Sequence, residues 1–139
     1  MRLNFFAIAG YNAKVNLLES IIEYILFNKG RKVIMNKEEI QNISFQLISY
    51  AGDACSCFMQ AVTKAKEGKC EEADELLSSG NEQLVKAHKA QTDLLVTEAQ
   101  GNDLEFSVLL IHAQDHLMTT IMYERIAKEF ISLYKERGE

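Results

Sequence analysis

A short run near the C-terminus combines two histidines with one carboxylate: His112-Ala113-Gln114-Asp115-His116-Leu117-Met118. A neutral imidazole is a nucleophile, and a hydrogen bond to its second nitrogen decides which nitrogen attacks. A carboxylate surrounded by apolar helix residues is costly unless it is paired, protonated or bound to a metal ion. The run is therefore a candidate site for covalent chemistry at His112, with a metal ion or a partner group at Asp115.

The elements that must position this run are helices. The chain contains no proline, and its apolar residues recur with the period of an α-helix rather than of a strand. Asn36 and Glu39 have the spacing of a capping box, and Gly68 is typical of a helix C-terminus. We expect helices from about 36 to 68, 70 to 100 and 104 to 135. Because the links are short, this pattern predicts an all-α, up-down-up three-helix bundle.

The first two helices each carry one apolar stripe that predicts the core. On the first helix the stripe is Ile40, Ile43, Leu47, Tyr50, Ala51, Ala54, Phe58, Ala61, Val62 and Ala65. On the second helix it is Ala73, Leu76, Leu77, Gly80, Leu84, Ala87, Gln91, Leu94 and Leu95.

The third helix differs because it has two apolar faces. With about 100° per residue, one face centres on Asp115 and the other lies opposite. The Asp115 face comprises Val108, Ile111, Met118, Met122, Ile126 and Leu133. The opposite face comprises Phe106, Leu110, Ala113, Leu117, Thr120 and Ile131. One three-helix bundle can bury only one of them well, so we expect another copy of the chain to cover the other. Several Asp115 carboxylates would then meet, and a hard divalent cation would neutralise them.

Composition and charge argue against several classes of function. The chain has 139 residues, which fits one domain. Residues 1–34 carry five Lys and Arg against two Glu (+3), and the remainder carries ten against eighteen (−8), which gives the net charge of −5. The acidic body argues against nucleic-acid binding. No apolar stretch is long enough to insert into a membrane. An odd number of cysteines (Cys55, Cys57 and Cys70) without a CxxC pair predicts reduced thiols in the cytoplasm.

The chain divides into an N-terminal segment, 1–34, and a body, 35–139. Residues 17–26 of the segment have an amphipathic helical pattern, which the run Asn28-Lys29-Gly30-Arg31-Lys32 interrupts. Gly30-Arg31 can be encoded by a ribosome-binding sequence at a plausible distance before Met35. We hypothesise that 1–34 is a translated leader from a start codon assigned too early. The alternative is an extra helical arm.

Three stretches of the body resemble a known family. They are Tyr50-Ala51-Gly52-Asp53-Ala54, the segment from Glu82 to Leu95 around Ala87-His88-Lys89-Ala90-Gln91-Thr92, and above all Ile111-His112-Ala113-Gln114-Asp115-His116-Leu117-Met118-Thr119-Thr120. The chain resembles the enzyme IIA component of the lactose/cellobiose class of the bacterial phosphoenolpyruvate-dependent sugar phosphotransferase system. The resemblance extends over 35–139, and residues 1–34 have no counterpart in the family.

The resemblance implies a homotrimeric phosphoryl carrier in the cytoplasm. His112 would be phosphorylated on Nε2 by the phosphocarrier protein HPr. A cysteine of enzyme IIB would accept the phosphoryl group, and the membrane enzyme IIC would then transport and phosphorylate the sugar. Asp115 from all three chains would hold one Mg²⁺ at the threefold axis.

Three neighbours of His112 are candidates for supporting roles. Gln114 points about 100° away from Asp115 on the helix, so we interpret it as a supporting hydrogen-bond donor and not a ligand. His116 would hydrogen-bond near the site or orient His112, and Thr119 would donate to a phosphoryl oxygen. His88, on the second helix, is a weaker candidate.

The resemblance also implies that the transported sugar is a β-linked disaccharide. Ala113 favours the cellobiose and chitobiose members of the family over the lactose members, which more often have Gly there.

Two other interpretations remain open from the residues alone. The segment around Gly68 resembles the turn of a tetratricopeptide hairpin, which would make the chain a protein-interaction module, although no repeat of about 34 residues follows. A helical metal-binding protein could instead use His112, Asp115 and His116, but it would need facing ligands, usually from an ExxH pattern, and none is evident.

Overall fold

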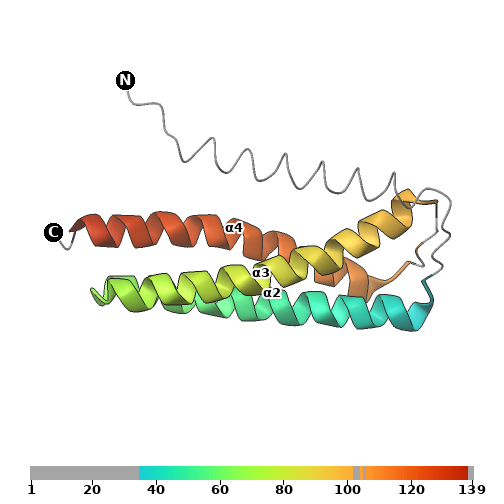
Figure 1. Ribbon diagram of the computed structural model, residues 1–139, viewed down its shortest axis with the longest axis horizontal. Coiled ribbons are helices and arrows are strands. Elements are labelled where there is room, and N and C mark those ends of the chain that lie inside the picture. Colours follow the sequence, from blue (N-terminus) through green and yellow to red (C-terminus); the bar gives the residue numbers. More distant parts are fainter. Residues whose placement is uncertain (1–34, 102–103, 105, 138–139) are drawn as a thin grey trace, which may run out of the picture. The chain divides into compact units, whose positions relative to one another are not determined.

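The computed structural model describes residues 35–101, 104 and 106–137. These contain three helices, α2 (Lys37–Lys66), α3 (Cys70–Ala99) and α4 (Val108–Arg137), each 30 residues long (Figure 1). The described part of the chain contains no strand, which confirms the all-α prediction. The predicted arm or leader, 1–34, lies outside the described residues.

Both ends of α2 form as the sequence predicts. The Asn36 side chain accepts a hydrogen bond from the Glu39 backbone N–H at 3.0 Å, and the Glu39 carboxylate accepts one from the Asn36 N–H at 2.8 Å. These two bonds are the capping box. At the other end Gly68 has a φ of 77°, and the Lys69 N–H donates to the Lys64 carbonyl at 2.9 Å. Gly68 favours this left-handed conformation because it has no Cβ. The chain can therefore reverse at once into α3.

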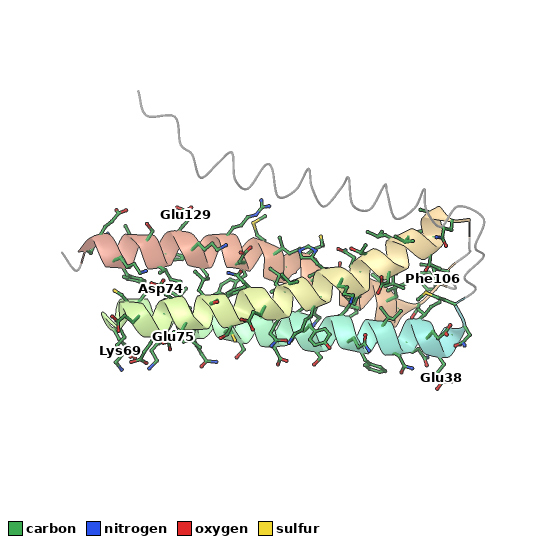
Figure 2. The ribbon with its side chains drawn as sticks, viewed as in Figure 1. Glu38, Lys69, Asp74, Glu75, Phe106 and Glu129 are labelled. Carbon is green, nitrogen blue, oxygen red and sulfur yellow. The ribbon has the colours of Figure 1, made fainter. Side chains whose placement is uncertain are left out.

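The beginning of α4 corrects the prediction. The helix begins at Val108 and not near Leu104, because Ser107 caps it: the Ser107 Oγ accepts a hydrogen bond from the Leu110 N–H at 3.3 Å. Phe106 thus precedes the helix, and it is 79% exposed instead of lying on the buried face. Figure 2 labels Phe106 next to the first turn of α4.

The contacts between helices establish the up-down-up order. From the α2–α3 turn onward, residue numbers fall along α2 as they rise along α3, from the pair Lys64–Glu72 to the Lys86 ammonium over the Tyr50 ring. Figure 2 shows Glu38 and Lys69 at opposite ends of the helices. The same antiparallel order relates α3 to α4, since Asp74 pairs with Lys135 and Gln91 with Gln114. α2 and α4 are therefore parallel, and they contact each other directly.

Small residues let the helices approach closely. One buried cluster joins all three helices through Ala61, Ala65, Ala73 and Ile131. The helices also approach closely at Gly80, where an added Cβ would lie 2.5 Å from Cε1 of the fully buried Phe58 ring. A side chain at this position would force the α2–α3 pair apart.

The chain divides into two compact units. One unit contains Asn36–Gln91 and Glu105–Glu139, and it carries all the contacts between helices described above. The other includes Thr92–Leu104, the end of α3 and the turn after it. Within that turn the Gly101 N–H donates to the Glu98 carbonyl at 2.9 Å, and Gly101 has a φ of 82°.

The predicted core stripes are correct with one exception. Leu95 is 46% exposed, while its neighbour Val96 is 4% exposed. Cys55, Cys57 and Cys70 are free thiols, as expected. Among the described helices, none combines the length and apolarity that a bilayer crossing requires.

Candidate phosphoryl-transfer site

The two predicted faces of α4 have opposite environments. Ala113, Leu117, Thr120 and Ile131 are buried between the helices. The opposite face is exposed although it is apolar; its exposed residues are Val108, Ile111, Met118, Met122, Ile126 and Leu133. A patch of this extent along one helix is typical of a surface that another protein covers. We call the face that these six residues form the outer face of α4.

Asp115 lies on the outer face, as the helical periodicity predicts. Its side chain is exposed, and Ile111 and Met118, one helical turn away on either side, are each about half exposed at 49% and 48%. Within one chain Asp115 therefore avoids the desolvation that a buried carboxylate would suffer. That cost arises only when something covers the outer face.

His112 lies at one edge of the outer face and is exposed. Its ring contacts the ring of His116, one turn later, with centroids 4.6 Å apart and planes at 87°. This edge-to-face contact restricts the rotation of both rings. An exposed imidazole with a restricted orientation is accessible to a phosphoryl donor from solution.

The two threonines after the motif have different surroundings. Thr120 is buried, and its Oγ1 donates to the Ala51 carbonyl of α2 at 3.2 Å. Thr119 is exposed and lies on the same flank of α4 as His112, as a rotation of about 100° per residue requires. Its hydroxyl can therefore reach a group bound at that flank.

Gln114 lies at the opposite edge of the outer face from His112 and bonds to α3. Its Oε1 accepts a hydrogen bond of 2.6 Å from Nε2 of Gln91. Gln91 also hydrogen-bonds the side chain of His88. Burial lowers the pKa of His88, while the charge of Glu124 and the bond to Gln91 oppose the decrease. Three residues from two of the motifs thus form one polar cluster.

Sequence reasoning missed this cluster. Gln91 was assigned to an apolar stripe, although an amide in such a stripe is itself a signal that a buried polar partner is near. Among the described residues, no three His, Cys, Asp or Glu side chains of one chain are grouped to hold a metal ion. The interpretation as a single-chain metal protein therefore has no support.

Comparison with known proteins shows to which protein family the chain belongs. The sequence model of one family, described as "PTS system, Lactose/Cellobiose specific IIA subunit", matches residues 42–135, which include the whole motif around His112. The chain belongs to this family. It is therefore a IIA subunit of the phosphotransferase system and a carrier of phosphoryl groups.

Curated relatives of this IIA subunit are similar along nearly their full length. The lactose-specific EIIA component of Staphylococcus aureus is 46% identical over 101 residues, covering 73% of this chain and 98% of the relative. The lactose-specific EIIA component of Streptococcus mutans is 48% identical, covering 73% and 97%. Each helix of this IIA subunit is almost as long as a complete tetratricopeptide repeat of about 34 residues, so that alternative is not supported.

Two crystal structures share the fold of this IIA subunit. The cellobiose-specific enzyme IIA of Bacillus anthracis is 48% identical, with a TM-score of 0.70, covering 76% of this chain and 94% of the other. PtcA of S. mutans is 40% identical, with a TM-score of 0.71, covering 73% and 99%. These similarities and the three observed helices establish the all-helical fold of the subunit.

Proposed function

We propose that this IIA subunit carries its phosphoryl group on Nε2 of His112. The observation that supports this most strongly is the placement of His112, which is exposed at the edge of the outer face and contacts His116. The other two described histidines are less accessible, since His88 and His116 are only partly exposed. We assign to His116 the orientation of the His112 ring and to Thr119 a hydrogen bond to a phosphoryl oxygen.

The donor would be HPr and the acceptor a cysteine of enzyme IIB, with the membrane enzyme IIC acting downstream. On loading, a lone pair on Nε2 of His112 forms the bond to phosphorus while the bond to the donor breaks, and the donor atom keeps that electron pair. On unloading, the thiolate sulfur forms the bond to phosphorus, and Nε2 keeps the pair. The protein contributes mainly positioning and charge stabilisation, since the phosphorus–nitrogen bond is already reactive. Because it exchanges phosphate with these partners, the subunit would act in the cytoplasm.

The subunit would act as a homotrimer. The outer face of α4 is apolar, exposed and continuous along the helix, and three copies packed around a threefold axis would bury it in the manner of a three-stranded bundle. This arrangement leaves His112 at the rim of the interface, within reach of partners.

One Mg²⁺ would then be held by Asp115 from the three chains. The donor set fits, because carboxylate oxygens are hard ligands, and because three carboxylates at an axis repel one another without a cation. Asp115 lies at the centre of the outer face, and one carboxylate is too few to hold the ion, so the three chains together would supply the ligands. Bound Mg²⁺ would neutralise charge at the axis.

The sugar would be a β-linked disaccharide, with cellobiose or chitobiose favoured over lactose. The choice between them follows from Ala113, which marks the branch of the family and, being fully buried, does not contact a sugar. Growth and uptake tests of a strain that lacks this subunit, on each disaccharide in turn, would identify it. Loss of lactose uptake alone would contradict our choice.

The central experiment is phosphorylation by phosphoenolpyruvate, enzyme I and HPr. We expect one phosphoryl group per chain in the wild type and in the His116→Ala variant, and none in His112→Ala. His88→Ala is the matched control, because it removes an imidazole from α3 and leaves α4 intact. Label that remains on His112→Ala would refute the assignment of His112, and an unlabelled wild type would refute the function.

A further inference from the structure

His112 and His116 have the spacing of a metal chelate. They lie four positions apart on α4, so their side chains project from the same side of the helix, one turn apart. Both are accessible, since His112 is exposed and His116 is partly exposed. Two histidines at this spacing on one helix face are the arrangement that holds zinc in the HExxH motif. The pair can therefore offer two nitrogens to one ion.

The distance between the two rings fits coordination of one metal ion. A zinc–nitrogen bond is about 2.0–2.1 Å long, which places the metal about 3.2 Å from the centre of each ring. For angles of about 90° to 110° between the two bonds, the ring centres are then about 4.5–5.2 Å apart. The observed distance between the centroids is 4.6 Å. The pair can therefore coordinate an ion without movement of the backbone.

Rotation of the rings alone would complete the site. The rings meet edge to face, with their planes at 87°, and coordination requires one nitrogen of each ring to point at the same ion. The Cβ–Cγ bond of histidine points toward the ring centre, so rotation about this bond redirects the nitrogens and leaves the centres in place. This torsion has broad minima. Two metal–nitrogen bonds would then replace the edge-to-face contact.

The nitrogens of both rings are available to an ion. Within the described part of the chain, neither imidazole forms a hydrogen bond to another group. His88 differs, because it is partly buried and is hydrogen-bonded to Gln91. The carboxylate of Asp115, which precedes His116, is exposed, and its negative charge attracts a cation to this part of α4.

The imidazole ligands select the kind of metal. Imidazole nitrogen suits Zn²⁺, Ni²⁺ and Cu²⁺, whereas Mg²⁺ prefers oxygen ligands. The pair therefore differs in chemistry from the magnesium site proposed at Asp115. Among the described residues of one chain, no third His, Cys, Asp or Glu is grouped with the pair, so water would fill the remaining positions. An ion held by two protein ligands is exchangeable, unlike a structural zinc ion with four.

We propose that His112 and His116 of one chain chelate a divalent transition-metal cation, represented by Zn²⁺, and that metal binding and phosphorylation of His112 exclude each other. Each imidazole donates a nitrogen lone pair to the metal and displaces one of its water molecules. At Nε2 of His112 this is the same lone pair that forms the bond to phosphorus. The exclusion rests on the proposed function, and the chelate does not. Zn²⁺ would thus inhibit loading, and a phosphorylated subunit would not bind it.

Calorimetric titration with Zn²⁺ tests the chelate in the full-length protein, with excess Mg²⁺ present to occupy Asp115. We expect one Zn²⁺ per chain in the wild type. His112→Ala and His116→Ala should each bind it about 10- to 100-fold more weakly, because a lone imidazole lacks the effective concentration that its neighbour provides. His88→Ala is the matched control and should bind like the wild type. Wild-type affinity in His116→Ala, or an equal loss in His88→Ala, would overturn the chelate.

Circular dichroism checks that each variant keeps its helices. Alanine is compatible with the exposed or partly exposed positions of His112 and His116 on α4. A wild-type protein that binds no Zn²⁺ overturns the chelate without reference to any variant.

Loading by phospho-HPr, purified away from enzyme I, tests the exclusion. We expect Zn²⁺ at about ten times its dissociation constant to slow loading of the wild type roughly 10-fold, since only the metal-free fraction reacts. Loading of His116→Ala should slow by about 2-fold at most, relative to the same variant without Zn²⁺. Equal slowing of the two proteins would show that the inhibitory Zn²⁺ binds elsewhere, and it would overturn the exclusion.

The reverse measurement separates the exclusion from the function on which it rests. Wild-type protein phosphorylated on His112 should bind Zn²⁺ as weakly as His112→Ala does. Phosphorylated protein that binds Zn²⁺ with unchanged affinity overturns the exclusion alone. Wild-type protein that HPr does not phosphorylate refutes the proposed function and the exclusion with it, whereas the titration by itself decides the chelate.

Discussion

The two faces of α4 belong to one helix yet use different residues. On the inner face, against α2 and α3, the small side chains of Ala113, Thr120 and Ala127 are buried beside Leu117 and Ile131. The outer face has no alanine among its six exposed apolar residues, and two of the six are methionines, Met118 and Met122. Small residues suit the close packing of a finished core, whereas methionine adapts to a surface that must form later with a partner. The difference indicates that the inner face holds the chain together and the outer face holds the assembly together.

We expect the largest effect from substituting two adjacent residues that lie on different faces of α4. Leu117 is fully buried and Met118 is 48% exposed. We expect Leu117→Ala to lower the free energy of unfolding by about 2–5 kcal/mol through the cavity it leaves. Met118→Ala should change the free energy of unfolding of the isolated chain by less than about 0.5 kcal/mol. Urea unfolding at low protein concentration measures both, and equal losses would remove the distinction between the faces.

We expect a charged side chain on the outer face to prevent trimer formation without unfolding the chain. Met122 is 57% exposed in the single chain, so Met122→Lys costs little there. In a trimer it would bring three ammonium groups to the axis, and we expect dissociation to monomers of unchanged helicity. Sedimentation velocity and circular dichroism measure the two properties. Gln60→Lys, on the exposed side of α2, is the control. A Met122→Lys protein that sediments like wild type would exclude the outer face as the interface.

The role of Asp115 can be separated from that of its apolar neighbours. We expect chelation with EDTA to lower the melting temperature of the wild-type assembly, because three unscreened carboxylates then repel one another. Asp115→Asn removes these charges, so its melting temperature should not respond to EDTA or to added Mg²⁺. An equal response of both proteins would place any bound cation elsewhere.

Substitutions of two adjacent threonines test the same difference between the inner and outer sides of α4, with a smaller expected effect. Thr120→Val removes the hydrogen bond to the Ala51 carbonyl, and we expect a loss of about 0.5–1.5 kcal/mol in stability with normal phosphorylation. Thr119→Val should preserve stability and slow phosphoryl transfer. The pair is compared by urea unfolding and by loading rates. A stability loss confined to Thr119→Val would reverse the assignment of the two faces.

The smallest effect concerns pH. Burial lowers the pKa of His88 from its ordinary value of 6.5, so below that pH the unfolded chain binds more protons than the folded one. Stability from this group is thus complete above pH 6.5 and decreases as the pH falls toward the folded pKa. We expect His88→Gln to lose less stability than wild type between about pH 7.5 and pH 5.5. Parallel curves for the two proteins in this range would contradict the desolvation of His88.

Local signals in the sequence predicted most of the fold. Asn36 with Glu39, and Gly68, specify the ends of α2 through bonds to residues a few positions away, and such bonds can be inferred without a tertiary structure. The helical repeat likewise predicted two apolar faces on α4, and Asp115 indicated which of them a single chain leaves uncovered. Ser107 carried an equally local signal for the start of α4, but the apolar pattern at Leu104 and Phe106 concealed it.

The site was predictable only in part, because some of its contacts are not local. His112 and Asp115 lie one turn apart, so their relation followed from helical periodicity. Gln91 and Gln114 are 23 positions apart, and whether they meet depends on the register of α3 against α4. That register is decided by packing at sites such as Gly80 and Phe58. No property of Gln91 itself specifies the register.

The tight reversal at Gly68 has a consequence for folding during synthesis. It lets α2 and α3 pair through contacts close in sequence, which form quickly, while the rest of the polypeptide is still inside the ribosome. The helix that bears both His112 and the outer face is synthesised after this hairpin and can pack against it as it emerges. Synthesis in this order shortens the time during which that surface is exposed to chaperones and to aggregation.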